Sequence, residues 1–143
     1  MAQVPRAQAP KAQAKDVMVR EVITVGKDFP VDDAIHEMVE NNITGLPVVN
    51  DDMTLAGIVT EKDLIRLLRN KDEHVKTVED FMTLGVVTFG PDASLEEICD
   101  CFMENNFRRV PIIDGDDIVG IISRGDIIKF LHGECDGSVD GKV

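Results

Sequence analysis

The sequence contains no tryptophan or tyrosine, and its six phenylalanines make aromatic residues only 4% of the 143 residues. Proteins that bind single-stranded nucleic acid without sequence preference stack the bases on aromatic side chains. Basic residues are also outnumbered, because 15 Lys and Arg stand against 27 Asp and Glu and give a formal net charge of −12. A chain this acidic has no large basic surface for a phosphate backbone. Both shortages argue against nucleic acid as a partner.

Long apolar runs and cysteines are scarce as well. No run approaches the roughly 18 residues that a membrane-spanning helix requires, so no membrane association is predicted. The three cysteines, Cys99, Cys101 and Cys135, are odd in number and irregular in spacing, which fits a reducing, cytoplasmic compartment. Cys99 and Cys101 would point in different directions on a helix, and His132 with Cys135 has no further ligand pair nearby. We therefore predict no metal site.

The two ends of the chain differ in composition from the rest. Residues 1–15 consist mainly of Ala, Gln and Pro with three basic residues and no acidic one, and they predict a flexible tail. A basic start without acidic residues can also belong to an organelle transit peptide, but this one is short and lacks serine. Residues 133–143 are rich in Gly and Asp and predict a second flexible tail.

The remaining sequence is an internal repeat. One series of residues recurs after 64 positions, and a later series recurs after 63 because one residue is missing from the loop that follows Asn50. The first series is Asp16, Met18, Val22, Thr24, Gly26, Asp28, Glu40, Asn41, Asn42 and Pro47, and the second is Gly57, Ile58, Asp63, Ile65 and Leu68. We place the repeats at residues 16–73 and 74–132. Two copies of a unit that cannot bury its apolar face alone predict one domain with pseudo-two-fold symmetry.

Each repeat shows the same order of secondary-structure signals. A β-branched run predicts a strand, apolar residues at helical spacing predict a helix closed by two asparagines in a left-handed cap, paired apolar runs predict a hairpin, and a second helix follows. The first repeat has these signals at 22–25, 31–40, 46–49 with 55–59, and 61–69, and the second at 86–89, 95–104, 110–113 with 118–122, and 124–131. The predicted class is α+β, with two β-α-β-β-α repeats packed sheet to sheet as an intramolecular pseudo-dimer.

The strand-to-helix junctions at 57–63 and 120–126 share the form glycine, two apolar residues, hydroxyl, two variable residues, aspartate. In the simpler interpretation, Thr60 and Ser123 cap their helices together with Asp63 and Asp126. The same groups can also hold a ligand. Backbone N–H groups and a hydroxyl at a helix start bind phosphate, whereas an aspartate repels phosphate and favours hydroxyl donors such as those of ribose. A phosphate beside a diol indicates a nucleotide.

A proline near the start of a strand is the second recurring element, at 43–49 and 107–113. Proline has no N–H, fixes the chain direction and leaves neighbouring backbone groups available to a ligand. A plain strand start would explain it equally well. In combination with the junctions, however, the pattern is far more specific than either element alone.

These elements together resemble the cystathionine β-synthase (CBS) domain pair, also called a Bateman module. The resemblance covers residues 17–131 and rests on 22–25, 44–49, 57–63 and their counterparts in the second repeat. It implies paired β-α-β-β-α units that assemble again into a disc-shaped homodimer. It also implies regulation by an adenosine-containing ligand such as AMP, ADP, ATP or S-adenosylmethionine rather than catalysis, with no required cofactor.

The resemblance further implies that each ligand site combines residues of both repeats. One repeat supplies the threonine of the first strand and the loop before the proline, and the other supplies the hydroxyl and the aspartate. One site would contain Thr88, Arg108, Arg109, Pro111, Thr60 and Asp63, and the other Thr24, Thr44, Gly45, Pro47, Ser123 and Asp126.

The two predicted sites differ where a phosphate would lie. Arg108-Arg109 stands where the first repeat has Thr44-Gly45. Arginine makes bidentate, charge-assisted contacts with phosphate, so we predict unequal sites, with the Arg109 site favouring phosphorylated ligands. The alternative is that both arginines are solubilising surface charges. Arg124 is a candidate to bring a charge to the other site.

No Ser/His/Asp or Cys/His constellation supports an enzyme, and none is predicted. The predicted function is that of a regulatory, energy-sensing module whose ligand modulates an unidentified effector protein. The alternative is an assembly scaffold whose junction residues only cap helices.

Overall fold

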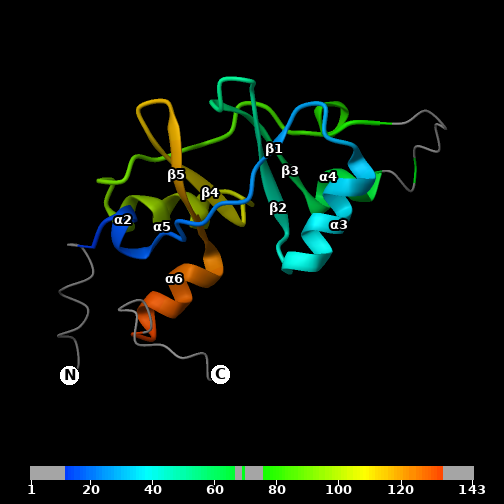
Figure 1. The fold of residues 1–143 in the computed structure, drawn as a ribbon. Coiled ribbons are helices and arrows are strands. Elements are labelled where there is room, and N and C mark those ends of the chain that lie inside the picture. Colours follow the sequence, from blue (N-terminus) through cyan, green and yellow to red (C-terminus); the bar gives the residue numbers. More distant parts are fainter. Residues whose placement is uncertain (1–11, 67–68, 70–75, 134–143) are drawn as a thin grey trace, which may run out of the picture. The chain divides into compact units, whose positions relative to one another are not determined.

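The computed structural model describes residues 12–66, 69 and 76–133 (Figure 1). The chain forms two compact units. Unit 2 comprises Ile23–Val86, and unit 1 comprises the segments Met1–Val22 and Val87–Val143 on either side of it. Each unit contains the hairpin and the two longer helices of one repeat, together with the opening segment of the other repeat.

Unit 2 is built on a three-stranded sheet in the order β1-β2-β3. β1 runs parallel to β2, and β2 runs antiparallel to β3. Its elements are β1 (Val25–Gly26), α3 (Val31–Asn41), β2 (Gly45–Val49), β3 (Leu55–Thr60), α4 (Glu61–Ile65) and the 3-10 helix η3 (Val78–Asp80). The helix α3 buries Val31, Ala34 and Met38, whose spacing of three and four places them on one face, against the apolar strand residues. Burial of this stripe fixes the helix on the sheet.

Unit 1 repeats this arrangement around an antiparallel pair, β4 and β5. Its elements are α2 (Ala14–Val17), α5 (Leu95–Glu104), β4 (Arg109–Asp114), β5 (Asp117–Ser123) and α6 (Arg124–Leu131). Leu95, Ile98 and Phe102 form the buried face of α5. Gly115 turns the hairpin with a φ of 66°, a conformation that favours glycine. The α+β class and the two β-α-β-β-α repeats are confirmed.

The segment that opens each repeat pairs with the hairpin of the other repeat. Val19 forms an antiparallel bridge with Ile121 of β5, and Thr83 forms one with Ile58 of β3. Val19 and Thr83 are 64 positions apart, so the two bridges are equivalent. The repeats of the sequence and the compact units of the structure therefore have different bounds: unit 2 ends at Val86, whereas the boundary predicted at residues 73 and 74 lies outside the described residues.

The predicted N-terminal tail extends too far into the chain. Ala14 is fully buried, and its N–H donates to the Ala93 carbonyl at 2.9 Å. The N–H of Leu95 donates to the Ala12 carbonyl at 2.9 Å. Two small buried alanines suffice for this packing, so residues 12–15 belong to unit 1 although they show no apolar period. Residues 1–11 and 134–143 of the predicted tails lie outside the described residues.

The first strand of each repeat is shorter than predicted. β1 has two residues, and the run at 86–89 makes a single parallel bridge from Phe89 to Ile112. The Phe89 N–H donates to the Pro111 carbonyl at 3.2 Å, and the Ile113 N–H donates to the Phe89 carbonyl at 2.8 Å. The next bond of a parallel ladder would need an N–H on Pro111, which proline lacks. Proline therefore ends the pairing here, and Pro47 occupies the same position beside β1.

The asparagine caps are confirmed in one repeat only. Asn42 has φ 55° and ψ 47°, the left-handed conformation predicted for it. Asn105 has φ −134° and ψ 170°, and Asn106, the counterpart of Asn42, does not have a positive φ either, so the left-handed cap predicted for the second repeat is wrong. The Asn105 side chain instead donates to the Cys101 carbonyl at 2.9 Å, which satisfies one of the terminal carbonyls of α5. Of the helix predicted at 61–69, the α-helix α4 covers Glu61–Ile65, and residues 67–68 lie outside the described residues.

Candidate ligand-binding residues

Both strand-to-helix junctions form capping boxes. The Thr60 N–H donates to Asp63 Oδ2 at 2.9 Å, and the Ser123 N–H donates to Asp126 Oδ2 at 2.8 Å. In return, the N–H of each aspartate donates to the hydroxyl of the capping residue, at 3.4 Å in unit 2 and 3.2 Å in unit 1. The structural role predicted for these four residues is confirmed, and any role toward a ligand is additional to it.

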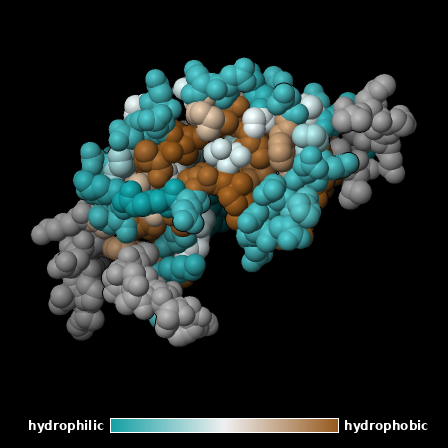
Figure 2. Space-filling view, viewed as in Figure 1, coloured by the Kyte–Doolittle hydropathy of each residue, from teal (hydrophilic) through white to brown (hydrophobic). Residues whose placement is uncertain are grey.

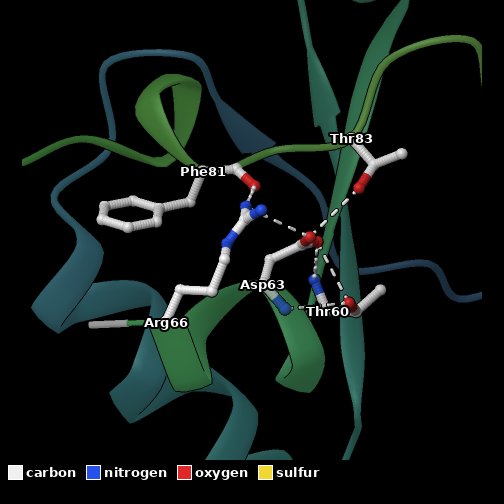
Figure 3. Close-up of polar contacts among 5 residues, drawn as sticks. All are labelled: Thr60, Asp63, Arg66, Phe81 and Thr83. Atoms are coloured by element: carbon white, nitrogen blue, oxygen red, sulfur yellow. Dashed lines mark hydrogen bonds and ion pairs between the residues drawn. The ribbon is translucent and has the colours of Figure 1, made fainter. Parts of the chain in front are cut away.

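Asp63 has further partners that the sequence analysis missed. Figure 3 shows its carboxylate between Thr60, Thr83 and Arg66. Oδ2 accepts from the Thr60 hydroxyl at 3.0 Å, Oδ1 accepts from the Thr83 hydroxyl at 3.1 Å, and Arg66 Nη2 lies 3.6 Å from Oδ1. Arg66 also donates to the Phe81 carbonyl at 3.2 Å. Asp63 is only 6% exposed and is the single buried charged residue among the described residues. Nothing in the spacing of the sequence connects Asp63 with residue 83.

Strand register places the predicted residues of unit 2 at one end of its sheet. Gly45 is paired with Thr60 across β2 and β3. The N–H of Glu61 donates to the Thr44 carbonyl at 3.1 Å. Thr24 lies one residue before β1, and the pairing of Val25 with Val48 places it level with Pro47 of β2. These residues and Asp63 therefore cluster within the unit.

Unit 1 brings its own set together in the same way. Arg109 is paired with Ser123 across β4 and β5, and the N–H of Arg124 donates to the Arg108 carbonyl at 3.0 Å. Thr88 directly precedes the Phe89 bridge that contacts Pro111. Asp126 completes the set through its capping box. Joining the sets of the two units into common sites stays a prediction.

The side chain of Arg124 binds the loop that carries the two arginines. Its Nε donates to the Phe107 carbonyl at 2.8 Å, and its Nη2 lies 3.5 Å from the Asn105 carbonyl. The suggestion that Arg124 brings a charge to the other site has no support in this arrangement, since the guanidinium is engaged with backbone carbonyls of its own unit. The counterpart of Arg124 in the first repeat is Glu61, which cannot donate in this way. Arg124 therefore fixes the loop before β4 in one repeat only.

Other chemistry-bearing groups lie apart from these sets. Across the described ranges, no group of three or more His, Cys, Asp or Glu residues is placed to hold a metal ion. Cys99 and Cys101 are not in a disulfide, and Cys135 lies outside the described residues. Partial burial, and then the charges of Asp100 and Glu96, raise the pKa of the Cys99 thiol. None of the described helices is long and apolar enough to span a membrane.

A hollow of about 520 Å³ lies within unit 2. It is lined by Lys27, Asn50, Leu55, Ala56, Glu79, Met82 and Leu84. Asn50 follows the end of β2 and Leu55 begins β3, so the hollow lies at the opposite end of the sheet from Gly45 and Thr60. None of the predicted ligand residues lines it.

A sequence model of the CBS domain matches residues 14–70 and 78–133. The chain belongs to the CBS domain family. Each of the two matched CBS segments contains one glycine-hydroxyl-aspartate junction, so the sequence repeat and the family assignment agree. The predicted resemblance is confirmed.

Several CBS proteins are similar over most of this chain. The crystal structure of CBSX2, a protein of Arabidopsis thaliana, in complex with AMP has a TM-score of 0.77 and 31% identity, covering 85% of this chain and 96% of that chain. The CBS domain pair of MJ0100 in complex with 5′-methylthioadenosine and S-adenosyl-L-methionine has a TM-score of 0.79 and 28% identity, covering 87% and 99%. The uncharacterized protein MJ1225 of Methanocaldococcus jannaschii is 33% identical over 82% of this chain, which spans 42% of its length. CBS pairs of this fold thus accommodate adenosyl ligands.

Proposed function

We propose that the chain is a regulatory CBS pair that binds AMP, ADP, ATP or S-adenosylmethionine and modulates a partner protein. The observation that carries the proposal is the register within each unit. In unit 2, Gly45 of β2 is paired with Thr60 of β3, and in unit 1, Arg109 of β4 is paired with Ser123 of β5. This places the start of one strand and the hydroxyl-aspartate junction side by side, twice, in a fold whose relatives are solved with AMP and S-adenosylmethionine. Each of these pairings joins a residue of one predicted site to a residue of the other, so the division of the proposed contacts into two sites that combine both repeats rests on the family resemblance.

A panel of adenosyl ligands tests this function by thermal unfolding. A ligand that binds only the folded chain stabilises it by about 2.7 kcal/mol when its concentration is a hundred times its Kd. We expect at least one of AMP, ADP, ATP and S-adenosylmethionine to raise the midpoint by several degrees, while inosine monophosphate at the same concentration serves as the control for the base. No shift with any of the four would contradict ligand binding and favour the scaffold.

The scaffold is the second candidate because the junctions are satisfied without a ligand. The capping boxes alone account for the hydroxyls and aspartates energetically. Apolar residues also reach the surface, as the brown areas of Figure 2 show. Equivalent helix positions in both repeats are exposed, with Val39 at 71% and Met103 at 83%, and Ile65 at 62% and Ile128 at 64%.

We propose that these helix surfaces are covered by a second copy of the chain. Exposed apolar side chains at equivalent positions of both repeats suit a two-fold assembly, because such an interface uses the same patch on both copies. Light scattering should give a particle of twice the chain mass of 15.8 kDa. Replacing Val39 and Met103 together by Glu should return it to one chain mass, whereas replacing the exposed Asp116 by Lys, in the turn between β4 and β5, should not. A strictly monomeric wild type at high concentration would contradict the homodimer.

Arg124 is expected to support phosphate binding without touching the ligand. Its two contacts with the Asn105 and Phe107 carbonyls hold the loop that presents Arg109. Arg124→Gln should weaken AMP binding by roughly three- to tenfold, which corresponds to the net worth of about one hydrogen bond. Adenosine, which has no phosphate, should bind equally well to wild type and variant. Glu61→Gln is the matched control in the first repeat, and an equal loss for both ligands would assign Arg124 a general structural role instead.

A further inference from the structure

Three hydrogen bonds already occupy the carboxylate of Asp63, and Arg66 faces its remaining acceptor position at 3.6 Å. A carboxylate offers about four lone-pair positions. Oδ2 accepts the backbone N–H and the hydroxyl of Thr60, and Oδ1 accepts the Thr83 hydroxyl and faces Arg66. Burial to 6% exposure leaves little room for a fifth group. A ribose diol brings two hydroxyl donors, so binding through both of them must release at least one of the three hydrogen bonds.

The four donors are not equally replaceable. The two from Thr60 belong to the capping box that starts α4, so their loss would expose the beginning of that helix. The Thr83 hydroxyl belongs to an exposed residue and can bond to water once released. Arg66 is 60% exposed and lies at 3.6 Å, which is a weak ion pair. Exchange with a ligand hydroxyl is therefore easiest at Oδ1, where Thr83 makes the shorter contact.

The second repeat lacks this competing donor. Val19 stands at the position of Thr83, and the equivalent bridges to Ile121 and Ile58 confirm the correspondence. Valine has no hydroxyl, so residue 19 cannot bond to Asp126 as Thr83 bonds to Asp63. Asp63 thus accepts a hydrogen bond from Thr83, a residue outside the junction motif, that Val19 cannot give to Asp126.

We propose that Thr83 is an affinity-determining residue that competes with the ribose of an adenosyl ligand for Asp63. This inference rests on the proposed function and adds an occupant that the ligand has to displace. The backbone of Thr83 is held independently, because its N–H donates to the Ile58 carbonyl at 2.8 Å and its carbonyl accepts from the Ile58 N–H at 3.0 Å. The exchange therefore involves the side chain alone, and Thr83→Val leaves the pairing of the segment intact.

Calorimetry with AMP and with 2′,3′-dideoxyadenosine 5′-monophosphate tests the competition. Both nucleotides carry the base and the phosphate, but only AMP has the diol. In an Asp126→Asn background, which weakens the other aspartate, Thr83→Val should bind AMP about fivefold more tightly, as expected for removal of one competing hydrogen bond. The affinity for the dideoxy nucleotide should stay within twofold. Thr83→Ser keeps the hydroxyl and should behave like the parent protein.

The possible outcomes separate the two proposals. Unchanged AMP affinity in Thr83→Val, or an equal change for both nucleotides, overturns the competition and leaves ligand binding intact. Absence of binding by both nucleotides to the wild-type chain overturns the competition for AMP, and the proposed function fails with it when ADP, ATP and S-adenosylmethionine also fail to bind. Unfolding midpoints of all variants serve as the folding control, and Thr83→Ala provides the same comparison if the valine variant does not fold.

Discussion

Arg109→Ala is expected to lower the affinity for AMP by about 10- to 100-fold, because a hydrogen bond to a charged group contributes roughly 1.5–3 kcal/mol. Arg109 begins β4 opposite Ser123 and is only partly exposed, so its backbone is fixed by the sheet. A side chain that extends from a fixed backbone loses less conformational freedom on binding phosphate than one on a mobile loop. Titration calorimetry with AMP on wild type and variant measures the effect.

Two comparisons show whether the loss comes from phosphate recognition. Adenosine should bind wild type and Arg109→Ala equally, because it has no phosphate for Arg109 to contact. Lys129→Ala removes an exposed cation of the same unit and should leave the AMP affinity within twofold. Unchanged AMP binding by Arg109→Ala would show that this arginine is a surface charge, and the predicted inequality of the two sites would then have no basis.

The sequence predicted those parts of the fold that local signals determine. The hairpins formed as expected, since paired β-branched runs around a turn need no distant information. The capping boxes at Thr60 and Ser123 also formed, because the donor and the acceptor are three residues apart. Asn42 is a left-handed cap, whereas its counterpart Asn106 is not, although both end the same Glu-Asn-Asn sequence. The backbone beyond the helix decides between the two conformations, and the residue type alone does not.

What the sequence analysis missed depends on contacts between distant segments. Thr83 meets Asp63 because residues 82–83 bridge to β3, and Arg124 meets the loop before β4 because its helix starts beside that loop. Both residues were visible as asymmetries of the repeat, at Val19 against Thr83 and at Glu61 against Arg124. The contacts that these residues make follow only from the strand register, which brings distant segments together. Comparing the repeats position by position would have marked them as candidates without assigning a role.

Two glycines, Gly57 and Gly120, lie where the opening segment of one repeat packs on the hairpin of the other. Gly57 and Gly120 occupy equivalent positions on β3 and β5, beside the segment that arrives from the other repeat. A Cβ on Gly57 would lie 2.7 Å from the Thr83 carbonyl oxygen, and a Cβ on Gly120 would lie 2.5 Å from Met18 Sδ. The first neighbour is backbone held by two hydrogen bonds to Ile58. The neighbours of Gly120 are all side-chain atoms of Met18, with Cγ at 2.7 Å and Cβ at 3.0 Å, and rotation of this flexible side chain can move Sδ and Cγ away.

Gly57→Ala should therefore destabilise the protein by about 2–3 kcal/mol, near the upper end for overpacking, and Gly120→Ala by about 1 kcal/mol. Urea unfolding of both variants measures the difference. A double-mutant cycle sharpens it, since Met18→Ala should recover most of the cost of Gly120→Ala, whereas Met82→Ala should recover little of the cost of Gly57→Ala. Equal costs with equal recovery would mean that the segment at residues 82–83 shifts as easily as a methionine side chain, and its backbone pairing with Ile58 could not then hold Thr83 beside Asp63.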